Sequence, residues 1–196
     1  MKRIFDIVMS GLGLICLSPL FLVLAVWIKS DSSGPVFYRQ IRVGRGNKDF
    51  RLFKFRSMRP DSDKLGLITV GGHDPRVTRS GYYIRKYKLD EFPQLINVFV
   101  GDMSLVGPRP EVRKYVDLYT PEQLRVLNVR PGITSLASIR YRNENEILAK
   151  ADDPDKTYVE QIMPDKIAID LEYVENASLT NDIKLIFKTF GEIIRK

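Results

Sequence analysis

Cysteine and histidine are almost absent from this sequence. Among 196 residues there is one cysteine, Cys16, and one histidine, His73. A single cysteine has no partner for a disulfide within the chain, and these two residues cannot supply a cysteine-rich or histidine-cluster metal site. The scarcity of histidine also argues against most Ser/His catalytic triads. We therefore expect a cytosol-facing protein whose chemistry depends on other side chains.

Charged residues are missing from one long segment near the N-terminus. Residues 7–28 contain no Asp, Glu, Lys or Arg. As a straight helix this segment would be about 33 Å long, enough to cross the hydrocarbon core of a bilayer. Ser18 and Pro19 lie near its middle, where a proline removes a backbone hydrogen bond and kinks a helix. Each half would then be about 16 Å long and would reach about one leaflet deep.

Positive charges flank this apolar segment on both sides. Lys2 and Arg3 precede it and Lys29 follows it, and such residues tend to stay on the cytoplasmic side. We therefore favour a re-entrant membrane helix-break-helix over residues 1–29, in which Ser18 or neighbouring protein satisfies the freed backbone groups. A single spanning helix is the next alternative, and a buried core helix is the third. The length of the segment and the lack of an A-x-A-like site disfavour a cleaved signal peptide.

Positive charge exceeds negative charge over the whole chain. The formal net charge is +7, and 44% of the residues are hydrophobic. The length and apolar content fit one domain over residues 30–196 after the apolar segment. An excess of positive charge commonly serves a polyanionic partner, and nucleic acid, anionic lipid headgroups and phosphorylated substrates are all open on composition alone.

Local patterns predict an α+β domain that is mainly α. Two strand-like segments around the turn at residues 44–47 predict a small β-hairpin over residues 36–42 and 50–56. A polar, glycine-rich segment predicts a loop over residues 60–75, and helices are expected over residues 79–87 and 90–100. Prolines punctuate the following segment and argue against a long regular sheet.

Residues 179–194 have an amphipathic pattern. Apolar side chains recur at helical spacing from Ile183 to Ile194, while Lys184 and Lys188 lie elsewhere around the helix. The pattern predicts either an interfacial helix that lies on anionic lipid or a helix packed on the core, and both alternatives are open.

Two adjacent acids, Asp90 and Glu91, are candidates for chemistry. With Pro93 in the first turn, they are expected at the N-terminus of a helix, where the dipole keeps an acid ionised. Acids in a first turn are usually mere caps. However, adjacent helical residues point about 100° apart, so one carboxylate can face a phosphorus atom while its neighbour holds a metal ion.

A carboxylate that reacts with an anionic diphosphate needs cations to offset the repulsion. Some of the basic residues lie in Gly-Pro turns, and a rigid turn can hold a guanidinium for bidentate phosphate contact. A single basic residue is more often a solvated surface group. The candidate phosphate-binding residues are Lys54, Arg56, Arg85, Arg109, Arg130 and Arg142.

Several segments together resemble the bacterial sugar transferase family, the monotopic polyprenyl-phosphate phosphoglycosyl transferases. The similarity runs in order through nearly the whole chain. The segments are Lys2-Arg3-Ile4-Phe5-Asp6, Ser18-Pro19, Pro35-Val36-Phe37, Phe53-Lys54-Phe55-Arg56-Ser57-Met58, Leu89-Asp90-Glu91-Phe92-Pro93-Gln94-Leu95, Asn97-Val98, Gly101-Asp102-Met103-Ser104-Leu105-Val106-Gly107-Pro108-Arg109-Pro110, Arg130-Pro131-Gly132-Ile133-Thr134 and Asp170-Leu171-Glu172-Tyr173-Val174-Glu175-Asn176.

The resemblance implies an enzyme at the bacterial inner (cytoplasmic) membrane, with a re-entrant helix and a catalytic domain that faces the cytoplasm. Its donor would be a UDP-sugar and its acceptor polyprenyl (undecaprenyl) phosphate, with UMP as the product and Mg²⁺ as the cofactor. Asp90 would be the nucleophile of a covalent phosphosugar intermediate, and Glu91 the Mg²⁺ ligand. Lys54, Arg85 and Arg109, with Arg142, would contact phosphates or shape the pocket. Anionic phospholipid is an expected partner, and a homodimer is left open.

Residues 135–143 depart from the family pattern. Many relatives read G-W-A-Q-V-N-G-R-N, whereas this chain reads Ser135-Leu136-Ala137-Ser138-Ile139-Arg140-Tyr141-Arg142-Asn143. The length and the Arg142-Asn143 ending are kept, but the tryptophan, the glutamine and the two glycines are not. The departure puts sugar or nucleotide contacts of this loop in doubt, and the sugar itself is not identified.

Two other classes of function are weighed against the enzyme. A membrane-attached scaffold would explain the basic surface, but it has no use for the acid pair and the Arg-Pro turns. Nucleic-acid binding rests only on charge. Aromatic residues such as Phe37 and Phe53 are more simply core residues than a stacking platform, so we expect no nucleic-acid partner.

Overall fold

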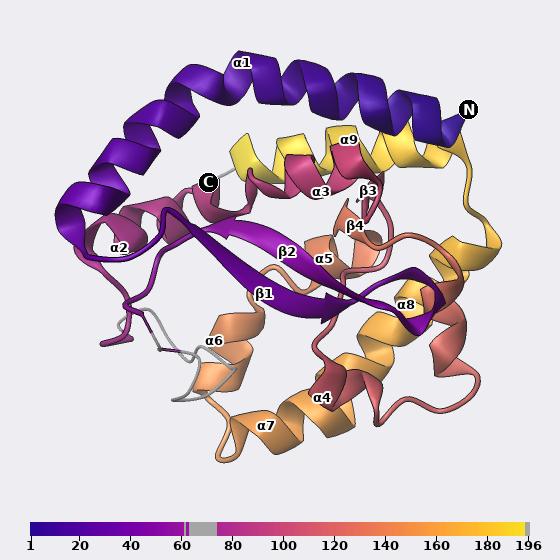
Figure 1. The fold of residues 1–196 in the computed structure, drawn as a ribbon. Coiled ribbons are helices and arrows are strands. Elements are labelled where there is room, and N and C mark those ends of the chain that lie inside the picture. Colours follow the sequence, from indigo (N-terminus) through magenta and orange to yellow (C-terminus); the bar gives the residue numbers. More distant parts are fainter. Residues whose placement is uncertain (61, 63–73, 195–196) are drawn as a thin grey trace.

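The computed structural model describes residues 1–60, 62 and 74–194. The chain is mainly helical, with a small antiparallel hairpin and a long apolar helix at the N-terminus (Figure 1). The predicted fold class, α+β and mainly α, is thereby confirmed. The loop predicted over residues 60–75 lies mostly outside the described residues.

The N-terminal helix, α1 (Lys2–Asp31), continues through Pro19. The prediction of two helices with a break was therefore wrong, because α1 bends without ending (Figure 1). Pro19 leaves the Ile15 carbonyl without its helical N–H donor, and the Ser18 hydroxyl donates a hydrogen bond to this carbonyl at 2.8 Å. Ser18 thus satisfies the freed group, as predicted, and this contact helps the bent helix remain continuous.

Both ends of α1 are attached to the rest of the chain. Near its start, the Lys2 ammonium donates to the Val106 carbonyl at 3.0 Å. At its end, the Asp31 carboxylate accepts a hydrogen bond from the Ser80 backbone N–H at 2.8 Å. The middle is largely uncovered, as the 71% exposure of Ile15 shows. The alternative of a buried core helix is therefore wrong, and by length and composition α1 is able to cross a membrane.

The predicted hairpin is confirmed. Strands β1 (Phe37–Val43) and β2 (Asp49–Phe55) pair antiparallel, with Phe37 opposite Phe55. A short 3-10 turn, η1 (Arg45–Asn47), joins them. Gly46 there has φ 67°, a left-handed conformation that glycine adopts without strain. The inner face of the hairpin packs Phe55 against α1 residues.

Two helices follow the hairpin, and the acid pair lies between them. Helix α2 (Arg79–Lys86) begins after Thr78, whose side chain accepts from the Gly81 N–H. The 3-10 turn η3 (Leu89–Glu91) then leads into α3 (Gln94–Val100). The predicted helix over residues 90–100 therefore begins later than expected, and Asp90 and Glu91 occupy η3. One reason is Pro93, which has no N–H to donate to an α-helical bond with Leu89.

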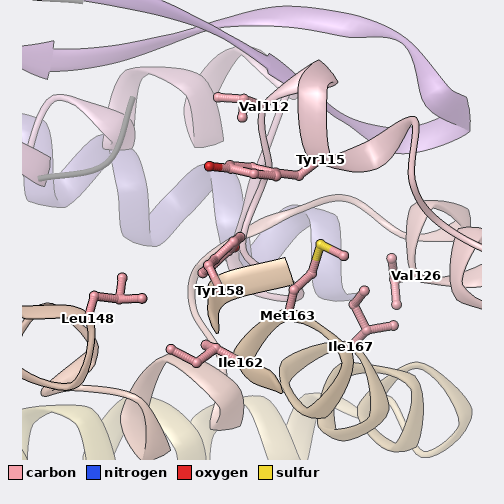
Figure 2. Packing of buried hydrophobic residues seen from close by; sticks show 8 residues of the cluster. All are labelled: Val112, Tyr115, Val126, Leu148, Tyr158, Ile162, Met163 and Ile167. Carbon is pink, nitrogen blue, oxygen red and sulfur yellow. The ribbon is translucent and has the colours of Figure 1, made fainter. Parts of the chain in front are cut away.

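A second, parallel pair of short strands lies beyond α3. Strand β3 (Ser104–Val106) pairs with β4 (Gly132–Thr134). The remaining elements are α4 (Arg113–Val116), η4 (Gln123–Asn128), α5 (Leu136–Arg140), α6 (Glu144–Ala149), α7 (Pro154–Thr157), the π-helical turn η5 (Tyr158–Ile162) and α8 (Met163–Glu175). Figure 2 shows a core cluster formed by these elements, which contains Val112, Tyr115, Val126, Leu148, Tyr158, Ile162, Met163 and Ile167.

The C-terminal helix α9 (Leu179–Ile194) has the predicted bounds. In Figure 1 it runs below α1, and Asp182 near its start forms an ion pair with Lys2 at the start of α1. One side packs on the protein, since Asp182 is buried and the Thr189 and Thr134 hydroxyls are 2.8 Å apart. The other side exposes Phe187 and Phe190, at 71% and 59%. The helix therefore combines a packed side with an uncovered apolar side.

Candidate active site

Glu91 is the centre of a charged cluster formed by three separate segments. Both of its carboxylate oxygens accept hydrogen bonds from the guanidinium of Arg109, which lies in the turn after β3. The ammonium of Lys54, on β2, lies 3.6 Å from Glu91 Oε1. The two-point contact fixes the plane of the guanidinium relative to the carboxylate. The side chains of Glu91 and Lys54 are about one-fifth exposed, so this pairing is only partly screened by water.

Asp90 lies next to this cluster, but its carboxylate is not fully paired as that of Glu91 is. Its Oδ1 atom is buried and has no hydrogen-bond partner among the described residues. Burial raises the pKa of Asp90, and the negative charge of Glu91 adds to the rise, while the positive charges of Lys54 and Arg85 oppose it. A buried carboxylate oxygen without a partner is uncommon. This oxygen is therefore available to react or to bind a ligand.

Opposite charges decide the ionisation of Glu91. Burial by itself would raise the pKa of Glu91, but the attraction of Arg109 and Lys54 outweighs it and holds the pKa well below the ordinary value. Reciprocally, Glu91 raises the pKa of Arg109. Burial lowers the pKa of Lys54, and Glu91 partly offsets this effect. Glu91 and Arg109 therefore remain charged, whereas Asp90 is the member of the acid pair that protonates more easily.

The turn that carries Arg109 is held by close backbone packing. The Gly107 N–H donates to Thr134 O at 3.0 Å, and the Gly132 N–H donates to Pro108 O at 2.9 Å. A Cβ atom at Gly107 would lie 2.5 Å from the Arg130 carbonyl oxygen, so only glycine fits there. The prolines on both sides of Arg109 restrict its backbone further. This rigidity explains how the guanidinium can be aimed at Glu91.

The structure brings together five of the predicted site residues and directs three elsewhere. The five are Lys54, Arg85, Asp90, Glu91 and Arg109, with Arg85 close enough to affect the pKa of Asp90. The other three guanidiniums cap helix C-termini, where carbonyl groups attract cations. Arg56 donates to Ser32 O at 2.7 Å after α1, Arg130 to Gly101 O at 2.9 Å after α3, and Arg142 to Glu192 O at 2.6 Å near the end of α9.

Asp170 was not singled out as a site residue from the sequence. Its side chain, on α8, is buried, and its Oδ1 atom has no hydrogen-bond partner in the described part of the chain. Burial raises its pKa to about 6, while the Ser135 hydroxyl and the backbone N–H of Arg109 limit the rise. Asp170 thus lies behind the Arg109 turn. No short-range pattern could have revealed this contact, because Asp170 follows Arg109 by 61 positions along the chain.

The acid pair is a small donor set for a metal ion. Among the residues that the structure describes, no group of three or more acidic, His or Cys side chains could hold one. Mg²⁺ does not need such a cage, because it commonly binds one or two carboxylates, substrate phosphates and water. Glu91, as a single carboxylate, fits this mode of binding. The cluster thus offers a carboxylate free to react, a second acid for a cation, and basic groups for an anion.

The chain is similar to known proteins over nearly its whole length. The model of the family described as "Bacterial sugar transferase" matches residues 1–196. The chain is 42% identical over 196 residues to the UDP-N-acetylgalactosamine-undecaprenyl-phosphate N-acetylgalactosaminephosphotransferase of Aeromonas hydrophila, a match that covers 98% of this chain and 43% of that protein. It is 36% identical to the UDP-glucose:undecaprenyl-phosphate glucose-1-phosphate transferase of Caulobacter vibrioides, with coverage of 98% and 69%.

A third relative has nearly the same extent as this chain. It is the exopolysaccharide production protein PSS of Rhizobium leguminosarum bv. phaseoli, which is 40% identical, with coverage of 96% of this chain and 92% of the relative. The chain thus spans less than half of the Aeromonas relative and most of the Rhizobium one. The match over its full length and the identities of 36–42% show one family. This chain belongs to the bacterial sugar transferase family.

Proposed function

We propose that this chain transfers a sugar 1-phosphate from a UDP-sugar to polyprenyl phosphate, with undecaprenyl phosphate as the expected acceptor. The observation that carries the proposal is the buried oxygen of Asp90, which has no hydrogen-bond partner among the described residues and lies beside the Glu91–Arg109–Lys54 cluster. Relatives named as undecaprenyl-phosphate sugar-phosphate transferases support the choice of donor and acceptor. The reaction would be a membrane step in the synthesis of a bacterial polysaccharide or glycoconjugate.

The proposed reaction has two phosphoryl transfers at one phosphorus atom. In the first, an Asp90 carboxylate oxygen attacks the sugar-bearing phosphorus of the UDP-sugar, and the bond between this phosphorus and the bridging oxygen breaks. UMP leaves with that oxygen, and an acyl phosphate links Asp90 to the sugar phosphate. In the second, an oxygen of polyprenyl phosphate attacks the same phosphorus. The Asp90–phosphorus bond breaks, and the carboxylate is restored.

The basic residues of the cluster offset the negative charge of the reacting groups. Arg109 presents a planar guanidinium, and Lys54 and Arg85 add positive charge close to Asp90. Such fixed charges favour phosphoryl transfer when they face the oxygens on which charge develops. Glu91 would hold Mg²⁺, which supplies positive charge to the diphosphate when it is bound. We limit the phosphate-binding role to Lys54, Arg85 and Arg109, since Arg56, Arg130 and Arg142 cap helices.

A screen for UMP release tests this function. Purified protein in detergent or nanodiscs would be given undecaprenyl phosphate, MgCl₂ and a panel of UDP-sugars. We expect one UDP-sugar, or a few, to give UMP together with a sugar-diphosphate lipid. If none of the UDP-sugars yields UMP while a characterised member of the family is active in the same assay, the proposed activity is wrong and the scaffold alternative gains support.

The pH dependence of the reaction should report the ionisation of the Asp90 carboxyl group. Only the ionised carboxylate is nucleophilic, and burial raises its pKa, so the rate should fall as the pH drops through that raised value. The charge of Lys54 lowers the pKa of Asp90. In a Lys54→Met variant the acidic limb of the kcat/KM profile should therefore move to higher pH, with a loss of about tenfold or more at neutral pH. An unmoved limb would contradict this link between Lys54 and Asp90.

We also propose that α1 is a re-entrant membrane helix and that residues 30–196 face the cytoplasm of a bacterial cell. A straight helix of this length would measure about 45 Å, and its ends would lie on opposite sides of a bilayer. Instead, both ends contact the same body, through Lys2 with Val106 and through Asp31 with Ser80. The exposed apolar middle of α1 and the uncovered Phe187 of α9 would then meet lipid from one side.

Labelling of single cysteines tests this topology. In a Cys16→Ser background, Ile4→Cys and Ser30→Cys would place one thiol at each exposed end of α1. A re-entrant helix predicts that a membrane-impermeant maleimide labels both thiols in inverted vesicles and neither in right-side-out vesicles. Labelling of the two thiols from opposite sides would mean a spanning helix. The wild-type protein, whose single thiol is Cys16, is a separate control, because this thiol should react only after the membrane is dissolved.

A further inference from the structure

The turn that carries Arg109 is also held from the side of strand β1. The Arg42 guanidinium donates to the Pro110 carbonyl at 3.0 Å, and the next residue, Val43, donates its backbone N–H to Glu111 O at 2.8 Å. Two successive carbonyl groups directly after Arg109 therefore bind two successive residues of β1. Arg109 itself lies between two prolines, so a constraint on Pro110 is passed on to its backbone.

A partly buried carboxylate, that of Glu111, holds Arg42 in this position. Glu111 Oε1 accepts from Arg42 at 3.0 Å and from the Val112 N–H at 2.8 Å. Its other oxygen accepts from the Tyr158 hydroxyl. The Nε and Nη2 atoms of Arg42 donate to Gln40 Oε1, at 3.1 and 2.9 Å. The Arg42 and Glu111 side chains are only 18% and 17% exposed, so water screens their pairing weakly.

Tyr158 reaches Glu111 from an unusual backbone element. It begins the π-helical turn η5, and π-helical turns occur frequently at functional sites. Its ring packs on Tyr115 with 4.8 Å between ring centroids, inside the cluster shown in Figure 2. The hydroxyl is thereby anchored by the core. The proposed reaction uses none of Arg42, Glu111 and Tyr158, although together they form a continuous polar connection from the core to the Arg109 turn.

We propose that Arg42, Glu111 and Tyr158 are positioning residues of the active site, which hold the Arg109 turn so that the guanidinium stays aimed at Glu91 and the donor diphosphate. The part that concerns the diphosphate rests on the proposed function. In the part of the chain that the structure describes, none of the three forms a hydrogen bond or an ion pair with Asp90 or Glu91. Their effect on the reaction therefore passes through Arg109, and we name them the Arg42 clamp.

Two variants separate the clamp from a general loss of stability. Arg42→Met removes the contact to Pro110 and keeps much of the apolar stem. Tyr158→Phe removes one hydroxyl and leaves the charge of Arg42 in place, so it tests the clamp without an electrostatic change near Lys54. The matched control is Arg113→Met, because Arg113 also links the hairpin to the segment after the turn, through Asn47 and Asp49, but at the exposed hairpin tip.

Hydrogen exchange of the intact protein in nanodiscs gives a readout that needs no activity. With Arg42→Met we expect the amides of residues 104–113 to exchange at least about tenfold faster, with a smaller increase for Tyr158→Phe, and no change in this segment for Arg113→Met. Segments such as α8 should exchange as in the wild type. Unchanged exchange over residues 104–113 in both clamp variants overturns the proposal, whatever the enzyme does.

A double-mutant cycle tests whether the clamp acts through Arg109. Arg42→Met should lower kcat/KM by about tenfold in the wild-type background, and by less than about twofold when Arg109 is already Lys. Equal losses of kcat/KM in both backgrounds would overturn the coupling. A purely structural defect would lower kcat/KM by the same factor whether or not Arg109 is present. If exchange responds as expected but no UDP-sugar gives UMP, the clamp stands and the proposed function fails.

Discussion

Replacing Asp90 with Asn is expected to abolish covalent labelling of the protein and to lower UMP release by more than about 10³-fold. The amide keeps the shape of the carboxylate, but it has no negative charge with which to attack phosphorus. The measurement uses a UDP-sugar labelled in the sugar-bearing phosphate. After a denaturing quench, label bound to the protein is counted in the absence of the lipid acceptor, and in the wild type it should disappear when the acceptor is added.

The matched control for this variant is Asp117→Asn. Asp117 is an exposed acid at the end of α4, where it pairs only loosely with Arg113 at 3.8 Å. Its variant should be labelled as strongly as the wild type. Label that persists undiminished in Asp90→Asn would show that another group carries the phosphosugar, and the assignment of the nucleophile would have to be abandoned.

The second large effect is expected for Glu91→Gln. This change removes the charge that pairs with Arg109 and Lys54 and leaves the expected Mg²⁺ ligand neutral. We expect kcat to fall by about 10²–10³-fold and the MgCl₂ concentration for half-maximal rate to rise by about tenfold or more. Rates measured across a MgCl₂ titration, with excess EDTA as the zero point, give both quantities.

Glu122→Gln serves as the control for Glu91→Gln. Glu122 is an exposed acid that forms a surface ion pair with Arg125, three residues further along the chain. Thermal unfolding of each variant should also be compared, since Gln at position 91 leaves Arg109 without its partner. An unaltered MgCl₂ requirement with a lower kcat would mean that Glu91 only orients Arg109. Glu91 would then no longer be assigned as a metal ligand.

Features that depend on neighbours in the sequence could be predicted well. The hairpin follows from two strand-like segments and a Gly-Asn turn that tolerates positive φ, and both strands lie within a residue of their expected bounds. Helix α9 follows from apolar residues at helical spacing. The role of Ser18 was also predictable, because its hydroxyl lies beside the carbonyl that Pro19 leaves without a partner.

Features that depend on competition between local and tertiary forces were predicted less well. Pro19 alone suggests a break, but the Ser18 contact and the docking of both ends of α1 keep the helix continuous. Pro93 suggested an acid pair inside the first turn of a helix, whereas the backbone forms a separate 3-10 turn before α3. In both cases the backbone around a proline can adopt more than one conformation, and the surrounding packing determines which one forms.

The amino-acid sequence sets which chemical groups this protein contains: an apolar N-terminal segment, an acid pair and an excess of basic residues, some of them in rigid turns. Which of those basic residues meet the acids depends on the tertiary structure. Lys54 and Arg109 reach Glu91 because β2, η3 and the turn after β3 converge, while Arg56, Arg130 and Arg142 are drawn to the carbonyl ends of helices. A guanidinium binds whichever anion or carbonyl the fold brings within reach, and that distance is set by packing between segments far apart in the chain.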